Sequence, residues 1–256
     1  MFKPLINIEI IPQLKDNYSY IVYSNLSQNA IIIDPAESRS ILNFITKKKL
    51  TIESILLTHH HEDHTAGVNL ILESNRSIEV FSPNTEIKET TKKINDGDFI
   101  NFNFCNFKVI ATPGHTIDHV VFYDKDNKII FSGDTLFRLG CGRIFEGTYK
   151  QMLNSLKIIE KIPDDTYVYC GHEYTLSNIN FLLSIFDDFK ELYEEKNIIR
   201  KQLKDQKFSI PFKLEGEKLL NPFLSTKSKH YQKFMESNNL NELAFFTYLR
   251  DKKNSF

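Results

Sequence analysis

The stretch Thr58-His59-His60-His61-Glu62-Asp63-His64 contains four of the eight histidines of the chain within six residues. It directly follows the apolar run Ile52–Leu57, a pattern typical of a buried strand. The histidines are therefore expected on the loop at the C-terminal end of that strand. A solvated, histidine-rich loop is the simplest alternative, and it would need no ligands from elsewhere in the chain.

Side chains alternate along an extended loop, so His59 and His61 should point to the same side and His60 away from it. His59 and His61 can then bind one ion. Asp63 and His64 lie beyond them, where the chain turns into a helix, and can face a second ion. Imidazole and carboxylate together suit Zn²⁺, Fe²⁺ or Mn²⁺.

Three further segments supply the missing ligands, and each follows an expected strand and carries a glycine beside the ligand. They are Thr112-Pro113-Gly114-His115-Thr116, Ser132-Gly133-Asp134-Thr135 and Cys170-Gly171-His172-Glu173. With the first loop they give five histidines and two aspartates, a suitable number for two ions if one carboxylate bridges them. Asp134 is the natural bridge, because a carboxylate has two oxygens and a neutral imidazole has one free nitrogen.

The remainder of the chain divides near residue 173 into a strand-rich part and a helical part. Expected strands are Ile6–Ile11, Tyr18–Tyr23, Ala30–Ile33, Ile52–Leu57, Val109–Ala111, Val120–Tyr123, Lys128–Phe131 and Tyr167–Cys170. Expected helices are Ser38–Lys49, Tyr149–Ile162, one long helix over Asn178–Leu203, and most of Tyr231–Leu249. The order of elements indicates an α/β protein but leaves several layer architectures open.

The pattern His59-x-His61-x-Asp63-His64, followed by His115, Asp134 and His172, resembles the metallo-β-lactamase superfamily. The resemblance implies an αββα sandwich with the metal site at one edge of its two sheets. It implies a catalytic domain over residues 1–173 and a C-terminal α-helical, substrate-binding domain over 174–256. One ion would be held by His59, His61, His115 and the bridging Asp134, and the other by Asp63, His64, Asp134 and His172.

Other segments resemble the glyoxalase II (hydroxyacylglutathione hydrolase) family within that superfamily. They are Leu14–Tyr20, Gly133–Phe137, Gly140–Gly147, Gly171–Thr175, Asn221–Leu224 and Arg250-x-x-Lys253. The resemblance implies hydrolysis of S-(2-hydroxyacyl)glutathione, typically S-D-lactoylglutathione, to glutathione and a 2-hydroxy acid, the second step of methylglyoxal detoxification. Glutathione would be held by Arg143, Tyr174, Arg250 and Lys253.

The chemistry expected of such a site needs no serine or cysteine nucleophile. Two divalent ions, with Zn²⁺ expected and Fe or Mn also compatible, lower the pKa of a bound water towards about 7. The resulting hydroxide attacks the thioester carbonyl, and Asp63 can accept a hydrogen bond from it. The thiolate leaving group has a pKa of about 8.5 and departs without obligatory protonation.

Three positions depart from the family pattern without touching an expected metal ligand. Phe145 stands where a tyrosine can occur, Asp118 where a glycine is usual, and Ser225 where an arginine often follows Asn-Pro-Phe-Leu. Arg143 stands where lysine is also familiar, which preserves charge but not donor geometry. These departures bear on substrate affinity and not on the class of reaction.

Four residues near the expected site have plainer interpretations. His60 is not expected to be a ligand, and His119 is expected to make a structural contact. Cys141 is expected to be a small buried packing residue. Asp34, at a strand end, is either a simple turn carboxylate or the partner that orients a ligand imidazole.

Composition excludes several classes of partner. With a net charge of −1 the chain has no global field for nucleic acid, and no apolar stretch is long enough to span a membrane. The three cysteines are far apart and fit a reducing compartment, and residues 1–5 begin no signal peptide, so a cytoplasmic location is expected. A monomer acting on a small molecule is the default.

Two kinds of alternative function remain at this point. The first is another hydrolase of the superfamily, such as a lactonase or a tRNA-processing type of nuclease, or a mono-iron persulfide dioxygenase. The dioxygenase should lack a full second set of ligands, whereas this chain has Asp63, His64 and His172. The second is a non-catalytic relative that binds metal or glutathione without turnover.

Overall fold

The computed structural model describes residues 6–256. Residues 1–5, on which the expectation of no signal peptide rests, lie outside the described residues. The chain forms two compact units, each considered by itself below. Unit 1 comprises the chain up to Ala111 and the segment Asp118–Gly133, and unit 2 comprises Thr112–Ile117 and Asp134–Phe256.

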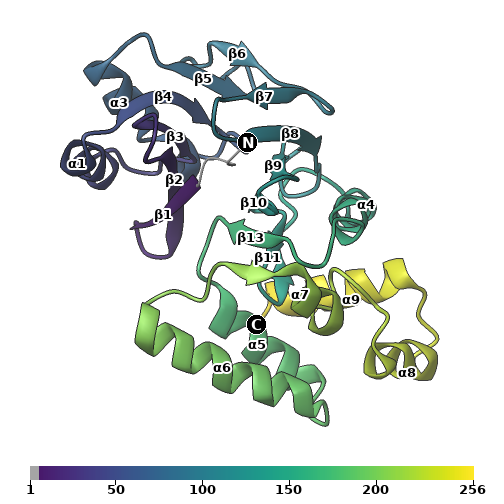
Figure 1. Cartoon of the computed structure of the whole chain (residues 1–256). Coiled ribbons are helices and arrows are strands. Elements are labelled where there is room, and N and C mark those ends of the chain that lie inside the picture. The colour runs from purple at the N-terminus through teal and green to yellow at the C-terminus, as the bar shows by residue number, and fades with distance from the viewer. Residues whose placement is uncertain (1–5) are drawn as a thin grey trace. The chain divides into compact units, whose positions relative to one another are not determined.

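Unit 1 contains a mixed six-stranded sheet whose strands follow one another in chain order (Figure 1). The strands are β1 (Ile6–Gln13), β2 (Asn17–Ser24), β3 (Asn29–Ile33), β4 (Thr51–Leu56), β5 (Glu79–Ser82) and β6 (Lys92–Lys93). The first three pair antiparallel, and β3 to β6 pair parallel. The parallel crossovers carry the helices α1 (Arg39–Lys48), α2 (Glu62–Thr65) and α3 (Val68–Ser74).

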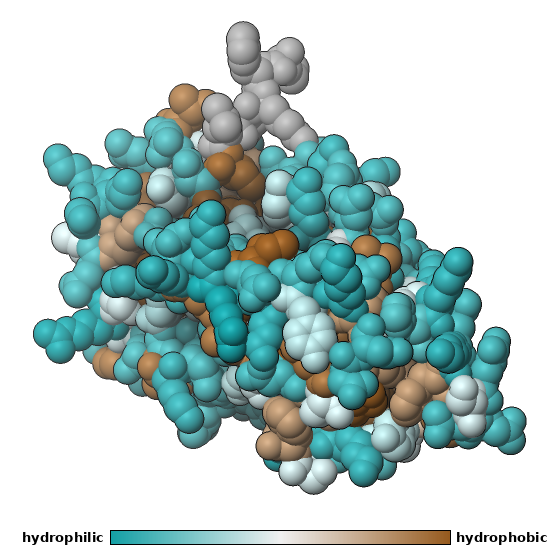
Figure 2. All heavy atoms as spheres, turned by 90° about the horizontal axis from the view of Figure 1, so that it is seen from below, coloured by the Kyte–Doolittle hydropathy of each residue, from teal (hydrophilic) through white to brown (hydrophobic). Residues whose placement is uncertain are grey.

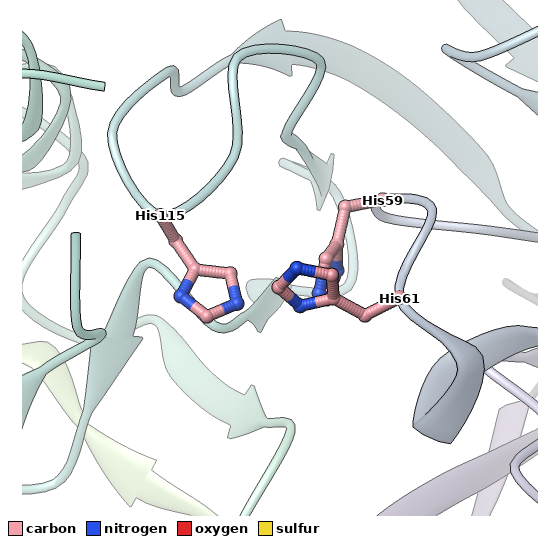
Figure 3. A group of neighbouring side chains, drawn as sticks. All are labelled: His59, His61 and His115. Atoms are coloured by element: carbon pink, nitrogen blue, oxygen red, sulfur yellow. The ribbon is translucent and has the colours of Figure 1, made fainter. Parts of the chain in front are cut away.

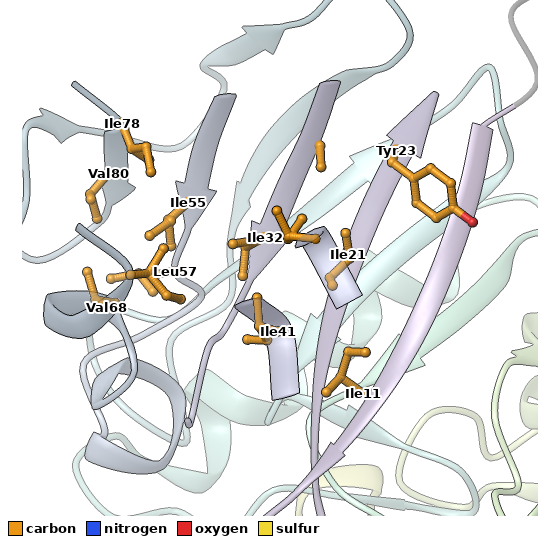
Figure 4. Packing of buried hydrophobic residues seen from close by; sticks show 13 residues of the cluster. Ile11, Ile21, Tyr23, Ile32, Ile41, Ile55, Leu57, Val68, Ile78 and Val80 are labelled. Atoms are coloured by element: carbon orange, nitrogen blue, oxygen red, sulfur yellow. The ribbon is translucent and has the colours of Figure 1, made fainter. Parts of the chain in front are cut away.

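The core of unit 1 lies between this sheet and the helices α1 and α3 (Figure 4). Ile32 from β3 is fully buried there, together with Ile41 from α1 and Val68 from α3. β3 has the sequence Asn-Ala-Ile-Ile-Ile and is buried along nearly its whole length, as expected of a central strand covered on both faces.

Unit 1 also contains four antiparallel strands that follow β6 in the sequence and do not belong to the first sheet. They are β7 (Phe99–Asn101), β8 (Asn106–Ala111), β9 (Val120–Asp124) and β10 (Ile129–Gly133). Tyr20 of β2 packs against Phe131 of β10, with ring centroids 5.1 Å apart, so these strands cover the inner face of the first sheet. In the turn between β9 and β10, the carboxylate of Asp124 accepts hydrogen bonds from the main-chain N–H and the side-chain amide of Asn127.

Unit 2 combines short strands with most of the helices of the chain (Figure 1). Its strands are β11 (Leu136–Phe137), β12 (Gly140–Cys141), β13 (Tyr167–Cys170) and β14 (Phe212–Lys213). Its helices are α4 (Tyr149–Glu160), α5 (Thr175–Ile185), α6 (Lys190–Gln206), α7 (Leu214–Leu220), α8 (Lys229–Ser237) and α9 (Glu242–Asn254). α4 begins at a capping box, in which Thr148 and Gln151 each bind the other's main chain.

The expectation of one long helix over Asn178–Leu203 is wrong, because the chain breaks between α5 and α6. Phe186 leaves the helical conformation, and both Phe186 and Phe189 turn inward onto Tyr231, with ring centroids 5.0 and 5.5 Å away. Burial of these two rings determines where the chain bends. The helical spacing of apolar residues in the sequence does not reveal this bend. The short strands β5–β7, β11, β12 and β14 were also not anticipated.

Among residues 6–256, no helix is long and apolar enough to cross a membrane. On the face drawn in Figure 2, hydrophilic side chains cover most of the surface and hydrophobic ones appear in separate patches.

We expect Ile32→Ala to lower the free energy of unfolding by about 2–5 kcal/mol, because it leaves a cavity in the centre of the core of unit 1. Urea denaturation measures the change. Leu26→Ala is the matched control, since Leu26 is 83% exposed and should lose little. A loss below about 1 kcal/mol for Ile32→Ala would contradict the central position of this side chain.

Candidate metal centre

The histidine loop that follows β4 brings the imidazoles of unit 1 together as expected (Figure 3). The ring centroid of His59 lies 4.7 Å from that of His61 and 4.3 Å from that of His64. His64 Nε2 lies 3.8 Å from the Asp63 carboxylate. His60 is bound to Asp118, with its Nδ1 2.9 Å from Oδ2 of that residue. The four expected ligands of this loop therefore cluster within unit 1.

Asp34 orients one of these imidazoles. Its carboxylate accepts hydrogen bonds from the main-chain N–H and the hydroxyl of Thr58, at 2.8 and 2.7 Å. The same carboxylate lies 3.0 Å from His64 Nδ1. A proton held on Nδ1 by a carboxylate leaves Nε2 with the lone pair that a metal requires. Of the two interpretations of Asp34, the structure supports the orienting one.

Thr58 orients a second imidazole. Its hydroxyl has one proton, which it donates to Asp34, so it accepts at 3.0 Å from Nδ1 of His59. His59 is fully buried and presents Nε2 on its other side. In both His59 and His64 the proton is therefore on Nδ1, and this tautomer suits metal binding through Nε2.

Asn17 positions Asp63, a role that the sequence alone does not indicate. Its side-chain amide donates to the main-chain carbonyl and to Oδ2 of Asp63, at 3.0 and 2.9 Å. These two bonds fix the carboxylate of Asp63. The only signal for Asn17 in the sequence is its place within the motif Leu14–Tyr20, which names no role for it.

The expected ligands of unit 2 form a cluster of their own around Asp134. Oδ2 of Asp134 lies 3.4 Å from His115 Nε2 and 3.3 Å from His172 Nε2. His115 donates from Nδ1 to the main-chain carbonyl of Arg143 at 2.7 Å, which again leaves Nε2 for a metal. All three ligand side chains are buried.

Buried neutral imidazoles beside carboxylates are the donors that Zn²⁺, Fe²⁺ and Mn²⁺ take in proteins, so these residues fit a divalent ion. Figure 3 draws three of these imidazoles, those of His59 and His61 from unit 1 and that of His115 from unit 2.

Gly133, directly before Asp134, is held at φ +47°. A Cβ there would lie 2.7 Å from Thr58 Oγ1 and 2.7 Å from His119 Nε2. His119 is buried and stacks on His59, with ring centroids 4.9 Å apart. The glycine is thus required both by its conformation and by its neighbours.

The four residues expected to hold glutathione all belong to unit 2. Arg143 is exposed, and its guanidinium lies over the ring of Phe145. Tyr174 stacks on His172, with ring centroids 4.8 Å apart. Lys253 donates to the hydroxyl of Ser177 at 2.7 Å. The cations and the aromatic ring therefore lie in the same unit as His172, an expected ligand.

Arg250 differs from the other three, because it is 5% exposed and donates to the main-chain carbonyl of Cys141 at 2.8 Å. Its guanidinium also lies over the ring of Phe223. Burial, together with the nearby charge of Arg250, lowers the pKa of Lys253 to about 8. Lys253 is therefore the cation of this pair whose charge can change near neutral pH.

The whole chain is similar to known hydrolases. A family described as metallo-beta-lactamase superfamily matches residues 14–80 and 78–172, and one described as hydroxyacylglutathione hydrolase C-terminus matches 173–256. A hydroxyacylglutathione hydrolase of Erwinia tasmaniensis is 39% identical over 98% of this chain and all of the relative. That of Citrobacter koseri is 40% identical, also over 98% of this chain and all of the relative.

The chain belongs to the hydroxyacylglutathione hydrolase family.

Solved structures agree with this membership at the level of the fold. The crystal structure of ETHE1 from Myxococcus xanthus covers 98% of this chain and all of its own, with a TM-score of 0.66 at 23% identity. The B3 metallo-beta-lactamase BLEG-1 covers 65% of this chain and 91% of its own, with a TM-score of 0.60 at 25% identity. The metallo-β-lactamase fold with a C-terminal helical region is thereby confirmed.

The three departures from the pattern of the hydroxyacylglutathione hydrolase family each have a visible environment. Asp118 binds His60, the loop histidine that points away from its ligand neighbours. Phe145 is 60% exposed and packs edge-on against His115, with ring centroids 5.2 Å apart. Ser225 is buried, and its main-chain N–H donates to the carbonyl of Asn221. None of the three occupies the place of an expected ligand.

Gly133→Ala should lower the free energy of unfolding by about 2–4 kcal/mol, because it adds both left-handed strain and a clash with Thr58 and His119. Gly216→Ala is the control, since a Cβ at Gly216 meets nothing within 4 Å and should leave stability unchanged or slightly raised. Chemical denaturation of both variants decides the matter. Equal effects would show that the approach at Gly133 is not restrictive.

Proposed function

We propose that this chain hydrolyses S-(2-hydroxyacyl)glutathione, typically S-D-lactoylglutathione, to glutathione and a 2-hydroxy acid. This reaction is the second step of methylglyoxal detoxification. The observation that carries the proposal is the match of residues 173–256 to the hydroxyacylglutathione hydrolase C-terminus. Full-length relatives bearing the name hydroxyacylglutathione hydrolase support it.

Two divalent ions are proposed to be held by the seven residues His59, His61, Asp63, His64, His115, Asp134 and His172. The imidazoles of His59, His64 and His115 each have Nδ1 hydrogen-bonded, which supports coordination of a metal through Nε2. Asp134 is proposed as the bridge, because its Oδ2 lies near the imidazoles of both His115 and His172. When bound, such ions supply Lewis acidity, which makes hydroxide available near neutral pH and polarises the thioester carbonyl.

The side chains of the protein hold and orient the reactants. Asp63, fixed by Asn17, is proposed to accept a hydrogen bond from the attacking water and so to hold its lone pair towards the carbonyl. The bond that breaks joins the acyl carbon to sulfur, and the thiolate has a pKa of about 8.5. It can leave unprotonated near neutral pH, so the proposed mechanism requires no separate general acid.

Substrate binding is proposed for Arg143, Tyr174, Arg250 and Lys253, and the helical domain is proposed to extend over residues 174–256. Glutathione carries two carboxylates, which need fixed cations in a chain whose net charge is −1. Arg143 and Lys253 are the best placed for ion pairing. Arg250 is already bound to the carbonyl of Cys141, so its contribution to a ligand would come from the remainder of its guanidinium.

The identity of the metal, the cellular compartment and the oligomeric state are also proposed. Zn²⁺ is the ion expected, with Fe or Mn as alternatives. TTHA1623, 26% identical over 65% of this chain and 91% of its own length with a TM-score of 0.55, is described in a di-iron-bound form. Cys105, Cys141 and Cys170 are all free and buried, which supports a reducing compartment such as the cytoplasm. A monomer is the proposed state.

The proposed function is tested by assaying the purified protein on S-D-lactoylglutathione and measuring the metal content of the same sample. Release of free thiol with two ions per chain is the expected result. Oxygen consumption with a glutathione persulfide, and one iron per chain, would indicate a dioxygenase instead. Binding of metal without turnover of any thioester would indicate a non-catalytic relative.

Asp134→Ala should lose both ions, because it removes the carboxylate proposed to join them. His60→Ala is the matched control and should keep both, since His60 is bound to Asp118. Elemental analysis after dialysis against trace metal measures the number of ions per chain in both variants. Full occupancy in Asp134→Ala would refute the proposed bridge.

The ammonium of Lys253 should make substrate binding depend on pH. Its pKa of about 8 lies below the ordinary value, so the positive charge is present below pH 8 and is lost as the pH rises through it. The KM for a glutathione thioester should therefore rise by about tenfold between pH 7 and 9, the effect of losing one charge-assisted hydrogen bond.

Lys253→Arg provides the comparison, because a guanidinium keeps its charge above pH 12. Its KM should not rise with pH in the way that the wild-type KM does. Steady-state kinetics at both pH values, with an uncharged thioester as a second substrate, measure the effect. A rise in KM of the same size in wild type and Lys253→Arg would show that another group titrates.

A further inference from the structure

Ser209 lies far in sequence from every proposed metal ligand, in the segment between α6 and β14. It is fully buried. Its main-chain N–H donates to Oε2 of Glu173 at 2.7 Å, and its hydroxyl donates to Oε1 at 2.7 Å. Both donors of Ser209 are therefore used on one carboxylate, which belongs to the residue directly after the ligand His172.

The carbonyl of Ser209 makes a third bond, to a different segment. It accepts from Nη1 of Arg138 at 2.6 Å. Arg138 is buried and lies in the turn of the hairpin β11–β12, four residues after Asp134. The same guanidinium is held by Gln202 and Glu195 of α6, at 2.8 and 2.6 Å.

One residue thus joins two segments that carry ligands. Glu173 and Arg138 have opposite charges, and Ser209 stands between them, donating to the carboxylate and accepting from the guanidinium. Charge-assisted bonds of this kind are roughly twice as strong as neutral ones. The spacing they set is that between the segments of His172 and Asp134, whose Nε2 and Oδ2 atoms lie 3.3 Å apart.

We propose that Ser209 is a positioning residue for the metal centre, acting through Glu173 and Arg138 to fix the distance between His172 and Asp134. The inference rests on the proposed function, since it takes these two residues to be metal ligands. Ser209 touches neither metal ligand itself. Its effect is expected on the affinity for the ion that His172 and Asp134 share.

The test is a competition for Zn²⁺ between a chromogenic chelator and the metal-free protein. Ser209→Ala removes the hydroxyl and keeps both main-chain bonds. Glu173→Gln keeps the volume of the side chain but turns one acceptor into a donor. Each variant should bind at least one of the two ions about 10-fold to 100-fold more weakly, the usual cost of disturbing a group that orients a ligand.

The control is Ser184→Ala, because Ser184 is exposed on α5 and its hydroxyl donates to the main-chain carbonyl of Phe181, three residues away in the same helix. It should bind both ions as the wild type does. The double variant of Ser209 and Glu173 should be no weaker than the weaker single variant, since both changes break the same link. Circular dichroism of the metal-free proteins checks folding, and Glu173→Gln serves if Ser209→Ala does not fold.

Three outcomes would overturn the inference. One is a wild-type affinity in both single variants, and another is additive losses in the double variant. The third is a lowered melting temperature with unchanged affinity, which would show that Ser209 only stabilises the fold. If the wild-type protein binds two Zn²⁺ ions in the same assay, the proposed ligands stand whichever of these three outcomes is found. A wild type that binds none refutes the proposed function as well.

Discussion

A neutral imidazole can bind a metal through Nε2 only if its proton is held on Nδ1, and the surroundings of the proposed ligand histidines meet this requirement. Three imidazoles meet it with three different acceptors. His64 uses the carboxylate of Asp34, His59 the hydroxyl of Thr58, and His115 the main-chain carbonyl of Arg143. Gly133 leaves room for Thr58, because a Cβ at this position would lie 2.7 Å from Thr58 Oγ1.

Much of the fold, and the ligand clusters within each unit, could be predicted because their signals are local. The ligand types follow strands in the sequence, and alternation along the loop separates His60 from its neighbours. The acceptors of the Nδ1 protons are not local, since Asp34 lies 30 residues from His64 and Arg143 lies 28 from His115. Arg143 acts on His115 through its carbonyl, which every residue possesses, so no side-chain pattern could identify it.

The helical region supports the segment that follows Asp134. Polar side chains from its helices bind the main chain of the hairpin β11–β12, which follows Asp134. Asn178 of α5 donates to the carbonyl of Arg138, and Asn221, at the end of α7, donates to that of Gly140. Glu217 of α7 accepts from the N–H of Leu139, and its burial raises its pKa to about 7. A two-residue hairpin could not satisfy these groups alone.

This arrangement explains why the basic residues near the C-terminus are not equivalent. An arginine has five donors in a fixed plane, so Arg250 can satisfy the buried carbonyl of Cys141 while it packs against Phe223. A lysine has a single movable ammonium, and Lys253 extends it between the rings of Phe181 and Phe256 to the hydroxyl of Ser177. A hydroxyl is a weak partner that a carboxylate can replace. The charge of Lys253 is therefore the one available to an anionic ligand, while that of Arg250 is bound to the fold.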